Sequence, residues 1–171
     1  MRRPRSIALA AALLSSLMPL FGPAVHAQVE PVPSGAAVAG AFDVNAVRTL
    51  LSRGDAAAAS GNLAEARRLY DQARDAARRL SGFYRSISGA FRGLDARIPR
   101  EMDDKGRQAL DLLTQANLRL AALFRREGQP EVAVPLLVEV VTALTPASDQ
   151  GRKAYQQLLE IGFVNTPYGA P

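Results

Sequence analysis

The sequence predicts an all-α protein of about five helices, arranged as antiparallel hairpins with one or two elongated helices. Apolar residues recur at steps of three and four along most of the chain after residue 42, which is the period of one helix face. Glycine, proline and helix-capping residues interrupt this pattern at a few places and mark the ends of the expected helices. The residues that follow the N-terminal segment are enough for one domain with its own core.

Residues 1–27 are predicted to be a secretory signal peptide that is cleaved after Ala27. Three arginines form its positive start, residues 6–20 are apolar, and small residues precede the cleavage position. The apolar run is interrupted by Ser15, Ser16 and Pro19 and is shorter than the roughly 20 residues of a spanning helix, which favours cleavage over a membrane anchor. Export would place the protein in the periplasm, in a thylakoid lumen if the source is photosynthetic, or outside the cell.

The first two helices are expected to follow a flexible leader. Residues 28–41 mix proline, glycine and small residues without a period, which is typical of such a leader. The helical domain, residues 42–162, should begin with a helix from Asp43, a candidate N-cap, to about Ser60. A second helix should start after Asn62, with a capping-box glutamate three residues later. We expect one long, imperfect helix to about residue 96, and a bend or break near residue 81 is the alternative because glycines weaken a helix.

Prolines and a glycine set the limits of the next two helices. Pro99 fits the first turn of a third helix, where its missing N–H costs nothing, and Gly128 should end that helix. A fourth helix is expected from Pro130 to about Leu144. Pro135 lies inside it and should kink the helix or postpone its start, because the proline ring removes a hydrogen bond.

A fifth helix and a C-terminal tail are expected after the fourth helix. Thr145 or Ser148 is expected to cap a fifth helix that runs to about residue 161, which leaves residues 163–171 as an extended tail. Three aromatic residues near this end can either pack back on the helices or present an anchor to a partner: Tyr155, Phe163 and Tyr168.

Small and aromatic residues around the first turn fall at the spacing that lets two antiparallel helices pack closely. Gly54 lies along the first helix, Gly61-Asn62 forms the turn, and Ala66 and Tyr70 follow on the second helix. Together these residues resemble one tetratricopeptide repeat. A poorer second unit has its turn at Gly128-Gln129, 67 residues after Gly61, against about 68 residues for two repeats of roughly 34.

The resemblance covers residues 44–80 and 114–146. It implies a right-handed stack of helix hairpins in which the last helix covers the open end, as terminal caps do in repeat arrays. A five-helix bundle without repeat geometry is the alternative.

In this family, partner peptides often lie in a concave groove lined by the first helix of each hairpin. The resemblance therefore implies that the chain binds another protein or an extended peptide, and the arginines of the expected groove would favour an acidic one. The carboxylate clamp of chaperone-binding members is missing, which disfavours a C-terminal acidic peptide. The candidate partner-binding residues are Arg48, Gln115, Arg119, Arg125 and Arg126, with Leu51, Ser52, Asp55, Leu118 and Ala122 on the same expected face.

Catalysis is not expected from this composition. The chain has no cysteine, and its single histidine lies inside the predicted signal peptide. The exported form would therefore lack the commonest general base and the usual zinc ligands. The carboxylate pairs Asp71/Asp75 and Asp103/Asp104 are expected to form salt bridges rather than to act as acid and base. The sequence predicts no catalytic residue, cofactor or metal.

A second candidate surface is basic. Residues 67–100 hold nine arginines against three aspartates, although the signal peptide's three arginines account for more than half of the chain's net charge of +5. The alternative function is peripheral binding of an anionic membrane surface through Arg67, Arg74, Arg78 and Arg85. An ordinary solvated face with pairs to Asp71 and Asp75 explains the same pattern. Export argues against nucleic acid as a partner.

An aromatic stripe on the long helix leaves one further choice open. Phe83, Tyr84, Ile87 and Phe91 share one helix face, where they either join the core or form an exposed docking stripe. The oligomeric state is equally open, since such a helix can pair with a second copy. The function we predict is a non-catalytic adaptor or assembly scaffold in an exported compartment.

Overall fold

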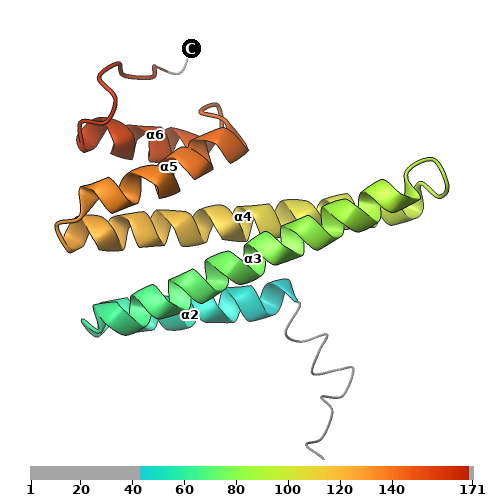
Figure 1. Cartoon of the computed structure of the whole chain (residues 1–171), viewed down its shortest axis with the longest axis horizontal. Helices are drawn as coiled ribbons and strands as arrows, with labels where there is room; N and C mark the ends of the chain where they lie inside the picture. Colours follow the sequence, from blue (N-terminus) through green and yellow to red (C-terminus); the bar gives the residue numbers. More distant parts are fainter. Residues whose placement is uncertain (1–42, 170–171) are drawn as a thin grey trace, which may run out of the picture. The chain divides into compact units, whose positions relative to one another are not determined.

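Residues 43–169 are described by a computed structural model, and they form five α-helices without a strand. The helices are α2 (Val44–Ala59), α3 (Leu63–Phe91), α4 (Arg97–Arg126), α5 (Pro130–Leu144) and α6 (Asp149–Glu160). Helices that follow one another in the chain pack antiparallel, so that α3 lies between α2 and α4, and α5 lies between α4 and α6 (Figure 1). The predicted all-α class is confirmed. The expected signal peptide and leader lie outside the described residues.

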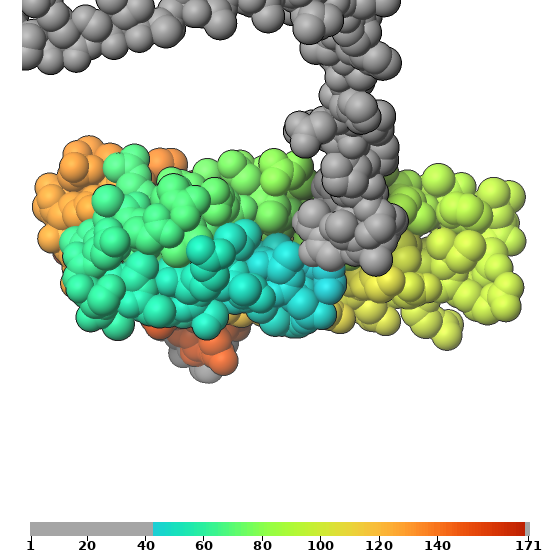
Figure 2. Space-filling view, turned by 90° about the horizontal axis from the view of Figure 1, so that it is seen from below, coloured from blue at the N-terminus to red at the C-terminus, as the bar shows by residue number. Residues whose placement is uncertain are grey.

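The two longest helices are α3 and α4, with 29 and 30 residues. At a rise of 1.5 Å per residue each is roughly 45 Å long. Their connected ends extend beyond α2, α5 and α6 as a two-helix hairpin (Figures 1 and 2). None of the helices within residues 43–169 is both long enough and apolar enough to span a membrane.

The end of α3 differs from the prediction. The helix passes Ser81 and Gly82 without a break but stops at Phe91, not near residue 96. Gly93 has a φ of 87°, a left-handed conformation that glycine adopts without steric cost, and it lets the chain turn here. The Asp95 carboxylate then accepts a hydrogen bond of 2.8 Å from the backbone N–H of Arg97, where α4 begins. The helix α4 begins at Arg97, and Pro99 lies in its first turn, as predicted.

The other helix ends follow local capping chemistry. The Asn62 side chain accepts a hydrogen bond from the Glu65 backbone N–H, which confirms the predicted cap of α3. Asp43 has the extended backbone of an N-cap but makes no side-chain cap bond. Ser148, and not Thr145, caps α6, because its Oγ accepts from the Gly151 backbone N–H at 3.0 Å.

Pro135 does not postpone α5, which begins at Pro130 and continues to Leu144. The C-terminal tail returns to α6 and contacts Tyr155 at two points. The Tyr155 hydroxyl donates to the Thr166 carbonyl at 2.8 Å, and its ring meets Tyr168 edge to face at 6.2 Å between centroids. Phe163 remains 57% exposed.

The core is built from leucines and from small residues that bring the helix backbones together. Ala66, Ala73 and Ala77 on α3 are fully buried, as are Ala109 and Ala116 on α4. One close approach joins α2 to α3, where a Cβ atom at Gly54 would lie 2.6 Å from Cδ1 of Tyr70. This is the close packing that the spacing of Gly54 and Tyr70 predicts.

Candidate functional site

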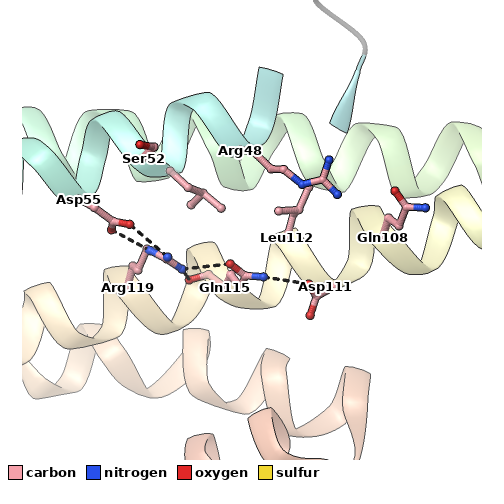
Figure 3. A pocket seen from close by; sticks show the side chains of 9 residues that line it. Arg48, Ser52, Asp55, Gln108, Asp111, Leu112, Gln115 and Arg119 are labelled. Carbon is pink, nitrogen blue, oxygen red and sulfur yellow. Dashed lines mark hydrogen bonds and ion pairs between the residues drawn. The ribbon is translucent and has the colours of Figure 1, made fainter. Parts of the chain in front are cut away.

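Two neighbouring hollows lie along the side of α4 that faces α2 and α6, and they share Gln115 and Arg119. The first has a volume of about 310 Å³ and separates α2 from α4 (Figure 3). It is lined by Arg48, Leu51, Ser52, Asp55, Gln108, Asp111, Leu112, Gln115 and Arg119. The second, of about 430 Å³, lies between α4 and α6 and is lined by Gln115, Leu118, Arg119, Ala122, Gln150, Lys153 and Gln157. We call the two hollows together the groove.

Eight of the ten residues expected on this face line the groove. They are Arg48, Leu51, Ser52, Asp55, Gln115, Leu118, Arg119 and Ala122. Arg125 and Arg126 line neither hollow. Arg125 instead reaches α6, where it donates to Gln157 Oε1 at 3.3 Å and to Glu160 Oε2 at 2.9 Å.

Sequence reasoning missed both ends of the groove. Gln108 lies about two helical turns before Gln115 on the same face of α4, so extending the helical period toward the N-terminus would have included it. The α6 residues had no comparable signal, because α6 belongs to neither repeat-like unit. They are Gln150, Lys153 and Gln157.

Asp55 on α2 lines the first hollow and joins α2 to both α3 and α4. Its two carboxylate oxygens accept hydrogen bonds from Arg119 Nε at 2.8 Å and Nη2 at 3.2 Å, a bidentate contact from α4 to α2 (Figure 3). The Tyr70 hydroxyl on α3 donates to the same carboxylate at 2.8 Å. The arginine predicted to meet a partner's carboxylate therefore already binds a carboxylate of this chain.

These contacts change the acidity of both partners. Partial burial alone would raise the pKa of Asp55, but the hydrogen bonds from Arg119 and Tyr70 outweigh it and hold the pKa below its ordinary value. Burial, followed by the hydrogen bond to Asp55, raises the pKa of Tyr70 to about 12. Asp55 is therefore an ionised acceptor at neutral pH, and Tyr70 is a neutral donor.

A second set of hydrogen bonds joins α4 to α6. Asp111 accepts from Gln115 Nε2 at 2.8 Å and from Gln150 Nε2 at 2.5 Å. The Thr114 hydroxyl donates to Gln150 Oε1 at 2.6 Å. These bonds hold the side-chain amides of Gln115 and Gln150 in place along the middle of the groove.

The groove combines these polar groups with an apolar floor. Leu51 and Leu112 are buried beneath the first hollow, and Leu118 is half-buried beneath the second. Such a surface offers contacts to an amide-containing chain with apolar side chains. Residues 43–169 contain no group of three or more histidine, cysteine or acidic side chains that is able to hold a metal ion.

Three of the four arginines of the second candidate surface make contacts within the chain. Arg74 donates to Asn117 Oδ1 at 2.7 Å and to Glu139 Oε2 at 2.8 Å, and Arg78 also donates to Glu139 at 2.8 Å. Arg67 lies 4.7 Å from the centroid of the Phe124 ring and 3.9 Å from the Asp71 carboxylate.

The partners of Arg74 and Arg78 differ from the expected pairs with Asp71 and Asp75. Both arginines cross to α5 because Glu139 lies between them, and their ion pairs are 2.8 Å long. Partial burial would raise the pKa of Glu139, but hydrogen bonds from Arg78 and Arg74 lower it below its ordinary value. The fourth member of this surface, Arg85, is exposed.

Neither a protein-family model, nor a curated protein, nor a solved structure matches this chain. The resemblance to a tetratricopeptide repeat therefore rests on the residues already named.

Proposed function

We propose that this protein is a non-catalytic scaffold that binds another protein in an exported compartment. In this proposal α2/α3 and α4/α5 are two hairpins of a tetratricopeptide-like, right-handed stack, and α6 covers its open end. The observation that supports it is the groove, since eight of the ten residues expected from the first helices of the hairpins line its two neighbouring hollows. The partner segment would lie along α4, between α2 and α6.

The chemistry of the groove describes the segment that would fit. Arg119 is paired with Asp55, so the middle of the groove recognises amides more than charges. Gln108 is exposed in the first hollow and Lys153 in the second, so they extend the contact surface in both directions. Arg48 and Lys153 supply one cation in each hollow, where acidic side chains of an extended peptide would be favoured.

Filling the groove without breaking its ion pairs tests this proposal. Ser52 and Ala122 are exposed, one in each hollow, and have no long-range hydrogen bond within residues 43–169. We expect the double variant Ser52→Tyr, Ala122→Tyr to fold and to lose its partner. The matched control is Gln72→Tyr, Gln156→Tyr, which adds the same bulk at exposed positions outside the groove.

The measurement is photocrosslinking in the source cells with the reactive residue at Gln108. A distinct protein crosslinked in the native chain and the control, but lost in the groove variant, supports the proposal. The same crosslinks in all three chains, or crosslinks of equal strength from a reactive residue at Gln72, would overturn it. Mass spectrometry of the purified protein separately tests the export part, which predicts Gln28 as the first residue.

A further inference from the structure

The turn between α3 and α4 carries an unusual combination of apolar and basic residues. We call residues 91–100 the tip, because they form the end of the α3–α4 hairpin beyond α2 and α5 (Figure 1). Leu94 is 79% exposed, more than any other large apolar side chain among residues 43–169. Phe91 at the end of α3 is 38% exposed, and Ile87 one turn earlier is 43% exposed. The hairpin therefore presents apolar groups to solvent at the point farthest from α6.

Arginines surround these apolar groups. The tip contains Arg92, Arg97 and Arg100 against one acid, Asp95. Asp95 is occupied by Arg97, whose Nη2 lies 2.8 Å from its carboxylate. Neither Arg92 nor Arg100 has an acidic partner among the described residues, so both guanidinium groups keep their charge available for an external anion.

Arg92 and Arg100 also line a common cavity of about 420 Å³. Its remaining lining residues are Gly93, Ala96, Pro99, Asp103 and Arg107. Asp103 accepts a hydrogen bond of 2.7 Å from the buried Ser88 hydroxyl, and Arg107 pairs with Asp104. With three arginines and one aspartate, the cavity carries a net positive charge beside the exposed Leu94.

We propose that the tip docks on an anionic membrane surface. Leu94 and Phe91 enter the interface between headgroups and acyl chains, while Arg92 and Arg100 bind lipid phosphates in and around the cavity. Apolar side chains beside cations are what such an interface recognises, because each term alone gives weak and reversible attachment. Guanidinium groups suit phosphate because they form paired, charge-assisted hydrogen bonds.

The structure also explains why the tip carries this role rather than the middle of α3. Arg74 and Arg78 bind Glu139, and Arg67 covers Phe124, so these three cations stabilise the helix packing. The basic charge left for a membrane lies further along the hairpin. This inference does not depend on the groove, because the groove uses residues 108–122 of α4 and the tip uses only its first turn.

Sedimentation with lipid vesicles tests the charge requirement. The full protein, purified from its source, is mixed with vesicles of phosphatidylcholine alone or with about three-tenths phosphatidylglycerol. We expect binding only to the anionic vesicles, and the double variant Arg92→Gln, Arg100→Gln should weaken it by about fivefold per arginine. The control Arg53→Gln, Arg79→Gln removes the same charge at exposed positions outside the tip and should bind within twofold of the native chain.

Salt and a soluble anion distinguish the possible causes of binding. Raising the salt from about 0.05 to 0.5 M should release the protein, because screening shortens the reach of the charges. Binding that is equal for both lipids, or equally weakened in the two double variants, would overturn the proposal. So would full competition by inorganic phosphate at millimolar concentration, which would make the cavity a site for a soluble anion. Residues 6–20 are themselves apolar and are the same in every variant. Comparing the variants therefore separates lipid binding by the tip from lipid binding by that segment.

A fluorescent side chain at Leu94 tests insertion directly. The chain contains no tryptophan, so Leu94→Trp provides the single indole signal. We expect its emission to shift to the blue on anionic vesicles and to be quenched by lipids with brominated acyl chains, whereas Gln72→Trp should show neither effect. An unchanged spectrum for Leu94→Trp, or formation of a protein dimer that buries it without lipid, would show that the tip does not enter a membrane.

Discussion

Gly54 shows how one missing side chain determines a helix contact. The ring of Tyr70 occupies the space that a Cβ atom at Gly54 would need, with Cδ1 only 2.6 Å from that position. From there the Tyr70 hydroxyl reaches Asp55, which also binds Arg119. A glycine on α2 thus places a tyrosine of α3 where it orients a carboxylate of the groove.

Gly54→Ala is expected to destabilise the protein by about 1 to 3 kcal/mol, because overpacking moves the Tyr70 ring or separates α2 from α3. Gly82→Ala is the matched control. It has open space around its Cβ position and lies inside α3, so it should raise stability by up to about 1 kcal/mol through helix propensity. Urea unfolding of the three proteins measures both effects. Equal stability of the two variants would contradict the proposed contact.

The start of α6 depends on the geometry of the turn that precedes it. Thr145 has a φ of 60°, uncommon for a residue with a branched side chain, and its carbonyl approaches Gly151. A Cβ atom at Gly151 would lie 2.7 Å from the Thr145 carbonyl carbon, and the Ser148 cap occupies the same turn. Since α6 provides one wall of the groove, its start affects the candidate site directly.

Gly151→Ala should therefore separate α6 from the turn that precedes it. We expect a loss of about 2 kcal/mol in stability and a faster amide exchange that is concentrated in α6. Gln156→Ala on the exposed side of the same helix should change stability by less than about 0.5 kcal/mol. Hydrogen exchange read by mass spectrometry gives the result helix by helix, and uniform exchange across all helices in Gly151→Ala would be inconsistent with a local effect.

Ion pairs between distant parts of the chain connect the helices across the described domain. Arg119 joins α4 to Asp55 on α2, Arg74 joins α3 to Glu139 on α5, and Arg125 joins α4 to α6. Their pairing explains why several arginines that a sequence reading assigns to partners serve the fold instead. It also makes the stability of the whole domain depend on pH.

Stability should fall on acidification because Asp55 and Glu139 both have a lowered pKa in the folded state. A carboxyl group whose folded pKa lies below its unfolded value stabilises the fold above the unfolded pKa, and this contribution disappears as the pH falls through the folded pKa. We expect the urea concentration at the midpoint of unfolding to decrease once the pH is lowered below about 4. Asp71 acts in the opposite direction, since burial raises its pKa, and it offsets part of the loss.

The double variant Asp55→Asn, Glu139→Gln tests the source of this pH dependence. It should be less stable than the native chain at pH 6 and should lose less on going to pH 3. Glu127 has no ion pair among residues 43–169, so the control variant Glu127→Gln should keep the native dependence of stability on pH. A double variant whose midpoint declines as steeply as that of the native chain would place the acid sensitivity elsewhere.

Much of the fold could be predicted from local patterns. The helical period and caps such as Asn62 indicated five helices, and the spacing of Gly54 and Tyr70 indicated a close contact. The end of α3 was predicted too late because a helix face alone does not show where Gly93 takes a positive φ. The predicted partners of Arg74 and Arg78 were wrong because local spacing favours Asp71 and Asp75, whereas Glu139 comes within reach only through the packing of α5.

The amino-acid sequence was sufficient for the helical class, the order of the helices and most of one groove face, because periodicity and capping act within a few residues along the chain. Which charges remain available to a partner was decided only by tertiary structure. Asp55 and Arg119 are 64 residues apart and meet at 2.8 Å, while Arg92 and Arg100 keep no acidic partner among the described residues. A charged side chain pairs with an opposite charge that helix packing places within a few ångströms. The distance between charges on different helices does not follow from the spacing of residues along one helix.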